Sequence, residues 1–98
     1  MKRIFKVKVF RNEHEIGTIT VEIDQAAIDI VDDAWRKDFY PLFSPETIVE
    51  HIAYSLFVHK SRLSSMYGWT SLPDDFAKII KDLNIYDDWQ FSAEEENV

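Results

Sequence analysis

Two stretches near the start of the chain alternate between apolar and polar side chains. In residues 4–10, Phe5, Val7 and Val9 are separated by Lys6 and Lys8. Residues 18–23 repeat the alternation, and their apolar members are Ile19, Val21 and Ile23. A period of two residues is typical of a strand that buries one of its faces. The two stretches therefore predict an antiparallel β-hairpin.

The polar residues between the two stretches predict the turn of this hairpin. They run from Asn12 to Glu15 and are followed closely by Gly17, but no Asn-Gly or Asp-Gly pair marks the turn type. An isolated two-stranded hairpin is only marginally stable in water. Its apolar face therefore needs a cover, which helices of the same chain or strands of a second copy would supply.

A first stretch of helical periodicity follows the hairpin directly. Asp24 is a suitable N-cap, because its carboxylate can accept hydrogen bonds from free backbone N–H groups. Apolar residues then recur at helical spacing: Ile28, Val31, Trp35 and Phe39. Pro41 disfavours a helical conformation at the residue before it, so this helix is predicted to end near Tyr40.

A second helix is predicted to begin at Ser44 and Pro45. The serine can cap the helix, and proline at the first helical position needs no hydrogen-bond partner for a missing N–H. Apolar side chains at helical spacing continue from there to Leu63. Gly68 is the expected stop, because glycine adopts the left-handed conformation at low cost.

A third helix is predicted from about Pro73 to Leu83. Its apolar residues recur at helical spacing, and they are Phe76, Ile79 and Ile80. The predicted architecture is therefore α+β, with an N-terminal antiparallel β-hairpin packed against about three α-helices.

The end of the chain is predicted to behave differently from the rest. Residues 1–91 are expected to form a single domain, with Trp89 or Phe91 docking onto it. Residues 92–98 are rich in glutamate and are expected to be a short, disordered acidic tail.

Composition narrows the classes of function. The 98 residues include no cysteine, which excludes disulfide scaffolds, thiolate zinc sites and thiol nucleophiles. The first residues form no apolar stretch of the roughly 7–15 residues that a secretory signal contains. No segment approaches the roughly 20 apolar residues of a membrane span. We therefore expect a cytoplasmic protein with no membrane contact.

The histidines do not form a recognisable catalytic or metal-binding motif. His51 and His59 are eight residues apart, which on one helix separates them by about 12 Å, too far to share a metal ion. The serines nearby lack the strand-turn-helix motif that presents a nucleophile. We expect no metal, no cofactor and no enzymatic activity. The alternative is an enzyme that uses His51 or His59, with a perturbed histidine pKa in a cleft.

The net charge of −7 is unevenly distributed along the chain. Residues 1–11 carry five bases and no acid, whereas residues 12–35 carry seven acids and no base. Residues 36–81 nearly balance, with six bases and five acids, and residues 82–98 carry six acids and no base. Two acidic blocks therefore flank a nearly neutral middle.

The first acidic block supplies the predicted contact surface. On one continuous helix, Asp29, Asp32 and Asp33 would share a face, where their like charges repel each other. Four more acids would add to the field around them: Glu13, Glu15, Glu22 and Asp24. One interpretation is a solvated face that keeps the protein in solution. The other is a carboxylate array that imitates the line of nucleic-acid phosphates and binds a basic protein surface.

The basic first strand indicates a different function, direct contact with nucleic acid. Its five cationic side chains could contact phosphate, and they are Lys2, Arg3, Lys6, Lys8 and Arg11. Charges on an edge strand also discourage aggregation, which explains them without a ligand. The acidity of the whole chain argues against direct nucleic-acid binding.

Several aromatic residues fall outside the helical patterns. Tyr67 and Trp69 flank Gly68, and Tyr86, Trp89 and Phe91 lie near the end. Packing in the core is the simpler interpretation of each. The alternative is an interface anchor, because tryptophan and tyrosine are enriched in binding hot spots.

In its small size, its acidity and its lack of site chemistry, the chain is similar to small inhibitor proteins encoded by phages and mobile elements. These include anti-CRISPR and anti-restriction proteins. This likeness of class predicts a non-enzymatic inhibitor. Its partner would be a protein with a basic, nucleic-acid-binding surface. The alternative is a self-assembling structural or regulatory protein, a homodimer whose hairpin edges pair across two copies.

Overall fold

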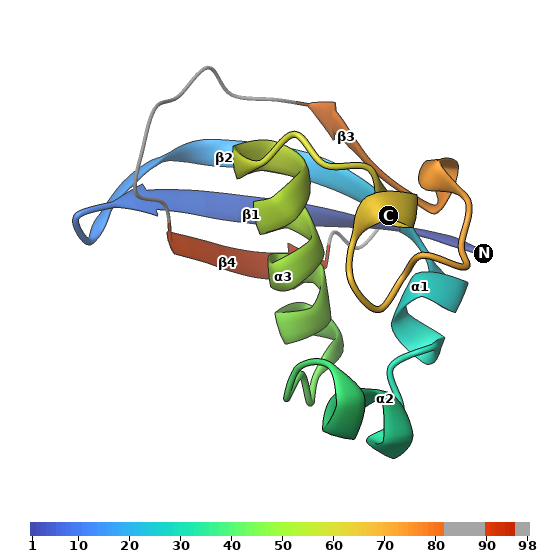
Figure 1. Cartoon of the computed structure of the whole chain (residues 1–98). Helices are drawn as coiled ribbons and strands as arrows, with labels where there is room; N and C mark the ends of the chain where they lie inside the picture. Colours follow the sequence, from blue (N-terminus) through green and yellow to red (C-terminus); the bar gives the residue numbers. More distant parts are fainter. Residues whose placement is uncertain (82–89, 96–98) are drawn as a thin grey trace.

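The computed structural model of the chain describes residues 1–81 and 90–95 (Figure 1). Its centre is a four-stranded antiparallel sheet in the order β3-β2-β1-β4. The strands are β1 (Lys2–Arg11), β2 (His14–Asp24), β3 (Ala77–Lys81) and β4 (Gln90–Glu95). An α+β fold is therefore confirmed, with a larger sheet than the predicted hairpin alone.

The predicted hairpin is confirmed as β1 and β2. Asn12 and Glu13 form its two-residue turn, with φ angles of 49° and 67°. Two successive positive φ angles are those of a type I′ turn, which here forms without glycine. A bulge lies between Val9 and Phe10. The six apolar side chains of the predicted face are all 0% exposed: Phe5, Val7, Val9, Ile19, Val21 and Ile23.

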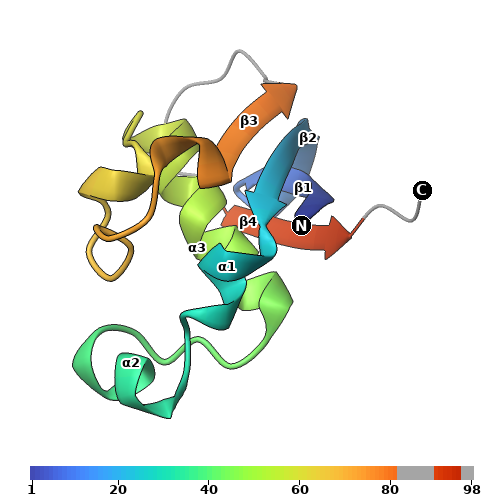
Figure 2. The same ribbon diagram turned by 90° about the vertical axis from the view of Figure 1, so that its right-hand side faces the viewer.

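The helices gather on one side of the sheet, over this apolar face (Figure 2). They are α1 (Gln25–Asp29), α2 (Asp33–Asp38) and α3 (Pro45–Val58), with the short 3-10 helices η1 (Leu63–Ser65) and η2 (Asp74–Phe76). The longest helix, α3, packs against β1, β3 and β4. Among the described residues, no helix has the length and apolar content needed to cross a membrane.

The prediction of one continuous helix from Asp24 to Tyr40 is wrong. The segment forms α1 and α2, which are separated by residues 30–32. Asp32 starts the second helix, because its carboxylate accepts the Trp35 backbone N–H at 2.8 Å. The break leaves Val31 and Trp35 each only 6% exposed, so both apolar side chains reach the core.

The second predicted helix is confirmed at its start and corrected at its end. Ser44 and Thr47 form a reciprocal capping box, and Pro45 is the first helical residue. The helix ends at Val58 rather than continuing toward Gly68. Lys60, two residues after the end of the helix, adopts a left-handed conformation with φ of 53°. The left-handed residue that follows the helix is therefore this lysine and not Gly68.

The third predicted helix is wrong. Only η2 is helical there, and it leads directly into β3. Ala77 and Ile79 face the core while Ile80 is 47% exposed, so the segment buries alternate residues as a strand does. The backbone of this segment pairs with the edge of β2, which satisfies its N–H and C=O groups. The sequence pattern does not reveal this long-range pairing.

Strand β4 differs from the predicted tail. It includes residues 92–95, and it pairs with β1 from Glu95 opposite Phe5 to Gln90 opposite Phe10. Both edges of the hairpin are thus covered by strands of the same chain. The predicted docking of Trp89 lies outside the described residues.

Two tryptophans connect the helices to the loop around Gly68. Trp69 is fully buried, and its indole N–H donates to the Ala27 carbonyl at 2.9 Å. The Trp35 ring lies 4.8 Å from it and donates to the Gly68 carbonyl at 2.9 Å. Gly68 has φ of +102°, and a Cβ placed there would lie 2.5 Å from Cζ2 of Trp35. Glycine is required here by both conformation and space.

Candidate functional site

The three central acids of the predicted contact surface do not share a helical face. Asp29 ends α1 and accepts a hydrogen bond from the Gln25 amide at 2.8 Å. Asp32 is the N-cap of α2, and Asp33 pairs with Arg36 at 3.0 Å. The shared face was predicted from one continuous helix and is therefore wrong. Each carboxylate has a local partner, and a role in binding stays a prediction.

Asp24 and Glu22 also have structural partners. Asp24 caps α1 by accepting the Ala26 N–H at 3.0 Å, and its carboxylate lies 3.6 Å from the N-terminal amine. These interactions, with the Ala26 hydrogen bond the largest, hold the pKa of Asp24 below its ordinary value. Glu22 pairs with Lys78 of β3 at 3.6 Å. Both acids therefore stabilise local structure in the sheet and at its end.

The remaining two predicted acids lie far from the others. Glu13 is in the hairpin turn, and Glu15 beside it pairs with Lys8 at 4.0 Å. This turn is at the opposite end of β2 from Asp24 and α1 (Figure 1). Eleven residues of strand separate the two ends by roughly 30 Å. The seven acids therefore form no single surface.

The histidines lie in three separate settings. His51 is half-buried, with its ring 4.3 Å from that of Tyr40 and 5.7 Å from that of Trp69. Burial lowers the pKa of His51, and the aromatic surroundings account for this shift without a catalytic partner. His14 and His59 are exposed. The part of the chain that the structure describes holds no group of three or more side chains suited to a metal ion.

The two aromatics around Gly68 have different roles. Trp69 is a core residue, as the packing interpretation predicts. Tyr67 is 65% exposed and meets the ring of Phe39 edge-on at 4.7 Å. Predictions for Tyr86 and Trp89 concern residues outside the described ranges, and so does the side chain of Phe91.

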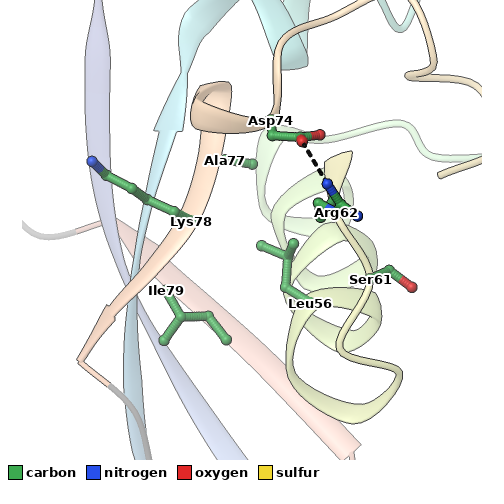
Figure 3. Close-up of a pocket in the computed structure, with 7 residues that line it drawn as sticks. All are labelled: Leu56, Ser61, Arg62, Asp74, Ala77, Lys78 and Ile79. Atoms are coloured by element: carbon green, nitrogen blue, oxygen red, sulfur yellow. Dashed lines mark ion pairs between the residues drawn. The ribbon is translucent and has the colours of Figure 1, made fainter. Parts of the chain in front are cut away.

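A groove of about 290 Å³ lies between the end of α3 and strand β3 (Figure 3). Its apolar part consists of Leu56 from the helix and of Ala77 and Ile79 from the strand. Leu56 and Ile79 lie on either side of the space (Figure 3). The groove therefore offers room for an apolar side chain between a helix and a strand.

Charged and polar residues form the rim of this groove. Asp74 accepts hydrogen bonds from the backbone N–H of Ser64 at 3.0 Å and from its hydroxyl. These bonds, the hydroxyl first, lower the pKa of Asp74 and keep it ionised. The Arg62 guanidinium lies 3.9 Å from the same carboxylate, and the Arg62 side chain is 80% exposed. The rim thus holds a fixed carboxylate and a loosely held guanidinium.

The groove also reaches the backbone of an edge strand. Lys78 lines it, although its side chain points away from the space (Figure 3). The main chain of β3 is therefore the part of Lys78 that faces the groove. Because β3 is the last strand in the order β3-β2-β1-β4, no other described strand pairs with its outer side. Backbone donors and acceptors, an apolar pocket and a guanidinium lie side by side here.

Prediction from the sequence missed this site because residues 73–83 were assigned to a helix. Its residues come from α3, from the loop after it, from η2 and from β3. The alternation of Ala77, Lys78 and Ile79 was the one available signal, and the adjacent Ile80 interrupts it.

No family model, curated protein or solved structure matches the chain. The predicted likeness of class to phage inhibitors stays a prediction. The described lining of the groove offers hydrogen bonds, charge and apolar contact.

Proposed function

We propose that this protein is a non-enzymatic binding protein that holds an extended segment of a partner protein along the outer edge of β3. The observation that carries the proposal is the apolar groove beside an edge strand. Strand addition combines main-chain hydrogen bonds, which supply affinity, with a side-chain pocket, which supplies specificity. The proposal keeps the predicted class, a protein-binding inhibitor, and moves the contact surface from the acidic block to the groove.

The first test is selection of ligands from a display library of random linear peptides. Backbone amide spectra of the isotopically labelled protein then locate binding of the selected peptides. We expect the largest shifts at residues 77–81 and at Leu56. Shifts confined to α1 and α2, where Asp29, Asp32 and Asp33 lie, would return the contact surface to the acidic block.

Two neighbouring isoleucines of β3 offer a matched pair of variants. Ile79 lines the groove, whereas the adjacent Ile80 does not and is 47% exposed. Ile79→Ala should weaken peptide binding, and Ile80→Ala should leave it nearly unchanged. Thermal unfolding of both variants separates loss of the pocket from loss of the fold. Equal binding by the two variants would contradict a groove-centred function.

Self-assembly is measured in the same samples by sedimentation velocity without peptide. A dimer that Ile79→Ala disrupts would mean that the edge of β3 pairs with a second copy.

A further inference from the structure

We infer that the segment held along β3 is acidic, with carboxylates on alternate residues and an apolar side chain between them directed into the groove. The inference rests on the proposed function and names the chemistry of its partner.

The side of β3 that faces away from the helices is basic. Lys78 is 54% exposed there, with Glu22 at 3.6 Å as its ion-pair partner. A register shift in the pairing of β3 with β2 places Lys81 opposite Thr20, on the same open face as Lys78. There Lys81 lines a hollow of about 180 Å³ together with Lys6, Thr18 and Thr20. Side chains of a strand added to β3 would come within roughly 5 Å of these lysines, measured between Cβ atoms. Carboxylates at those positions would complement them.

The helix side of the strand adds a third cation. Arg62 is at the rim of the groove, and its distance of 3.9 Å from Asp74 is at the limit of an ion pair. Asp74 already accepts two hydrogen bonds from Ser64. A guanidinium has five N–H donors, so Arg62 can bind a ligand carboxylate, in bidentate fashion where the geometry allows.

The same charges disfavour a second copy of β3 as the occupant. Antiparallel pairing of two such strands would bring Lys78 and Lys81 of one copy beside those of the other. Like charges on neighbouring strands destabilise pairing, and edge lysines are a common protection against it. An acidic segment has the opposite effect, because its carboxylates on the open face lie beside Lys78 and Lys81.

The acidity of the whole chain does not oppose this match. Residues 1–81 carry all eleven basic side chains and twelve of the eighteen acids, so this part of the chain is close to neutral. Charges beyond about 10 Å are largely screened at moderate salt. Beside β3, the three cations Lys78, Lys81 and Arg62 face two partner carboxylates, Glu22 and Asp74, so a local excess of positive charge remains.

The test uses three capped seven-residue peptides in which valine alternates with glutamate, glutamine or lysine, each flanked by glycine and serine. Dissociation constants from calorimetry or amide shifts are compared at one ionic strength. We expect the glutamate peptide to bind about tenfold more tightly than the glutamine peptide, since exposed ion pairs contribute up to about a factor of five each. The lysine peptide should bind most weakly.

Variants assign the preference to the cations. The double substitution Lys78→Gln and Lys81→Gln should remove most of the preference for glutamate. Arg62 lies on the helix side, where these peptides present valine, so Arg62→Gln should change the preference little. Lys37→Gln, in the exposed part of α2, is the matched control and should leave the preference intact.

The possible outcomes separate the inference from the proposed function. Equal binding of the glutamate and glutamine peptides at β3, weakened by Ile79→Ala, would overturn the acidic partner and leave the groove as the binding site. A preference for the lysine peptide would overturn the sign of the complementarity. Absence of any shift at β3 with all three peptides would overturn the inference and the proposed function together.

Discussion

The two faces of the sheet consist of the same strands but are stabilised by different interactions. On the covered face, the six inward side chains of β1 and β2 are 0% exposed, and each contributes about 1.5–3 kcal/mol by burial. On the open face, pairs such as Lys78–Glu22 at 3.6 Å and Lys8–Glu15 at 4.0 Å lie in water and contribute about 0–1 kcal/mol each. The covered face therefore determines stability, and the open face and its edge can change with little cost to the fold.

The difference between the two faces is tested most directly by truncating one side chain on each face of β1. Phe5→Ala should lower the free energy of unfolding by about 3–5 kcal/mol, because Phe5 is fully buried. Lys8→Ala should change it by about 0.5 kcal/mol or less. Chemical denaturation of both variants measures the difference. Similar losses would mean that the open face contributes to stability as the covered face does.

The second prediction concerns the contact between the helical layer and the loop before β3. Gly68→Ala should lower the free energy of unfolding by about 2–4 kcal/mol, since its Cβ would lie 2.5 Å from Trp35 Cζ2. The φ of +102° adds backbone strain. Thermal and chemical unfolding measure the loss. Repeating the substitution in a Trp35→Leu background should reduce the cost, whereas an unchanged cost would assign it to the backbone alone.

The contrast between the faces also explains how much of the fold the sequence could predict. β1 and β2 are adjacent in the chain and alternate strictly, so local pattern determined both their pairing and their buried face. The start of α3 was equally clear, because Ser44 and Pro45 are specific signals. The pairing of β1 and β2 begins at their shared turn, and the cap of α3 spans three residues, so neighbouring residues determine both elements.

The elements that the sequence did not predict depend on distant partners. Phe76, Ile79 and Ile80 fit helical spacing, but the unpaired edge of β2 converts residues 77–81 into a strand. The candidate groove follows from that strand, since Leu56 and Ile79 are 23 residues apart and meet only when β3 forms. The shared helical face predicted for Asp29, Asp32 and Asp33 failed for a local reason, because Asp32 caps a new helix that the apolar spacing did not reveal.

A third prediction tests whether this acid acts as a cap. Asp32→Ala should lower the free energy of unfolding by about 0.5–2 kcal/mol, because the Trp35 N–H loses its acceptor. Asp32→Asn should retain most of the stability, since asparagine also caps helices. Chemical denaturation of both variants measures the effect. Equal losses would mean that the negative charge, and not the hydrogen bond, is what matters at this position.

The smallest expected effect is a pH dependence from Asp24, at the end of the sheet. Its pKa in the folded protein is below its ordinary value, with the Ala26 hydrogen bond as the largest cause. A lowered pKa in the folded state means that Asp24 stabilises the protein fully above the ordinary aspartate pKa of about 4. This contribution is lost as the pH falls through the folded-state pKa.

Asp24→Asn keeps an oxygen that can accept the Ala26 N–H but removes the titration. The variant should therefore lose less stability than the natural sequence between about pH 6 and about pH 3, which thermal unfolding at a series of pH values measures. Asp38→Asn, an exposed position at the end of α2, serves as the acid-to-amide control. An identical pH profile for Asp24→Asn and the natural sequence would mean that acid destabilisation arises elsewhere. The polar end of the sheet would then contribute to stability only through the neutral hydrogen bond.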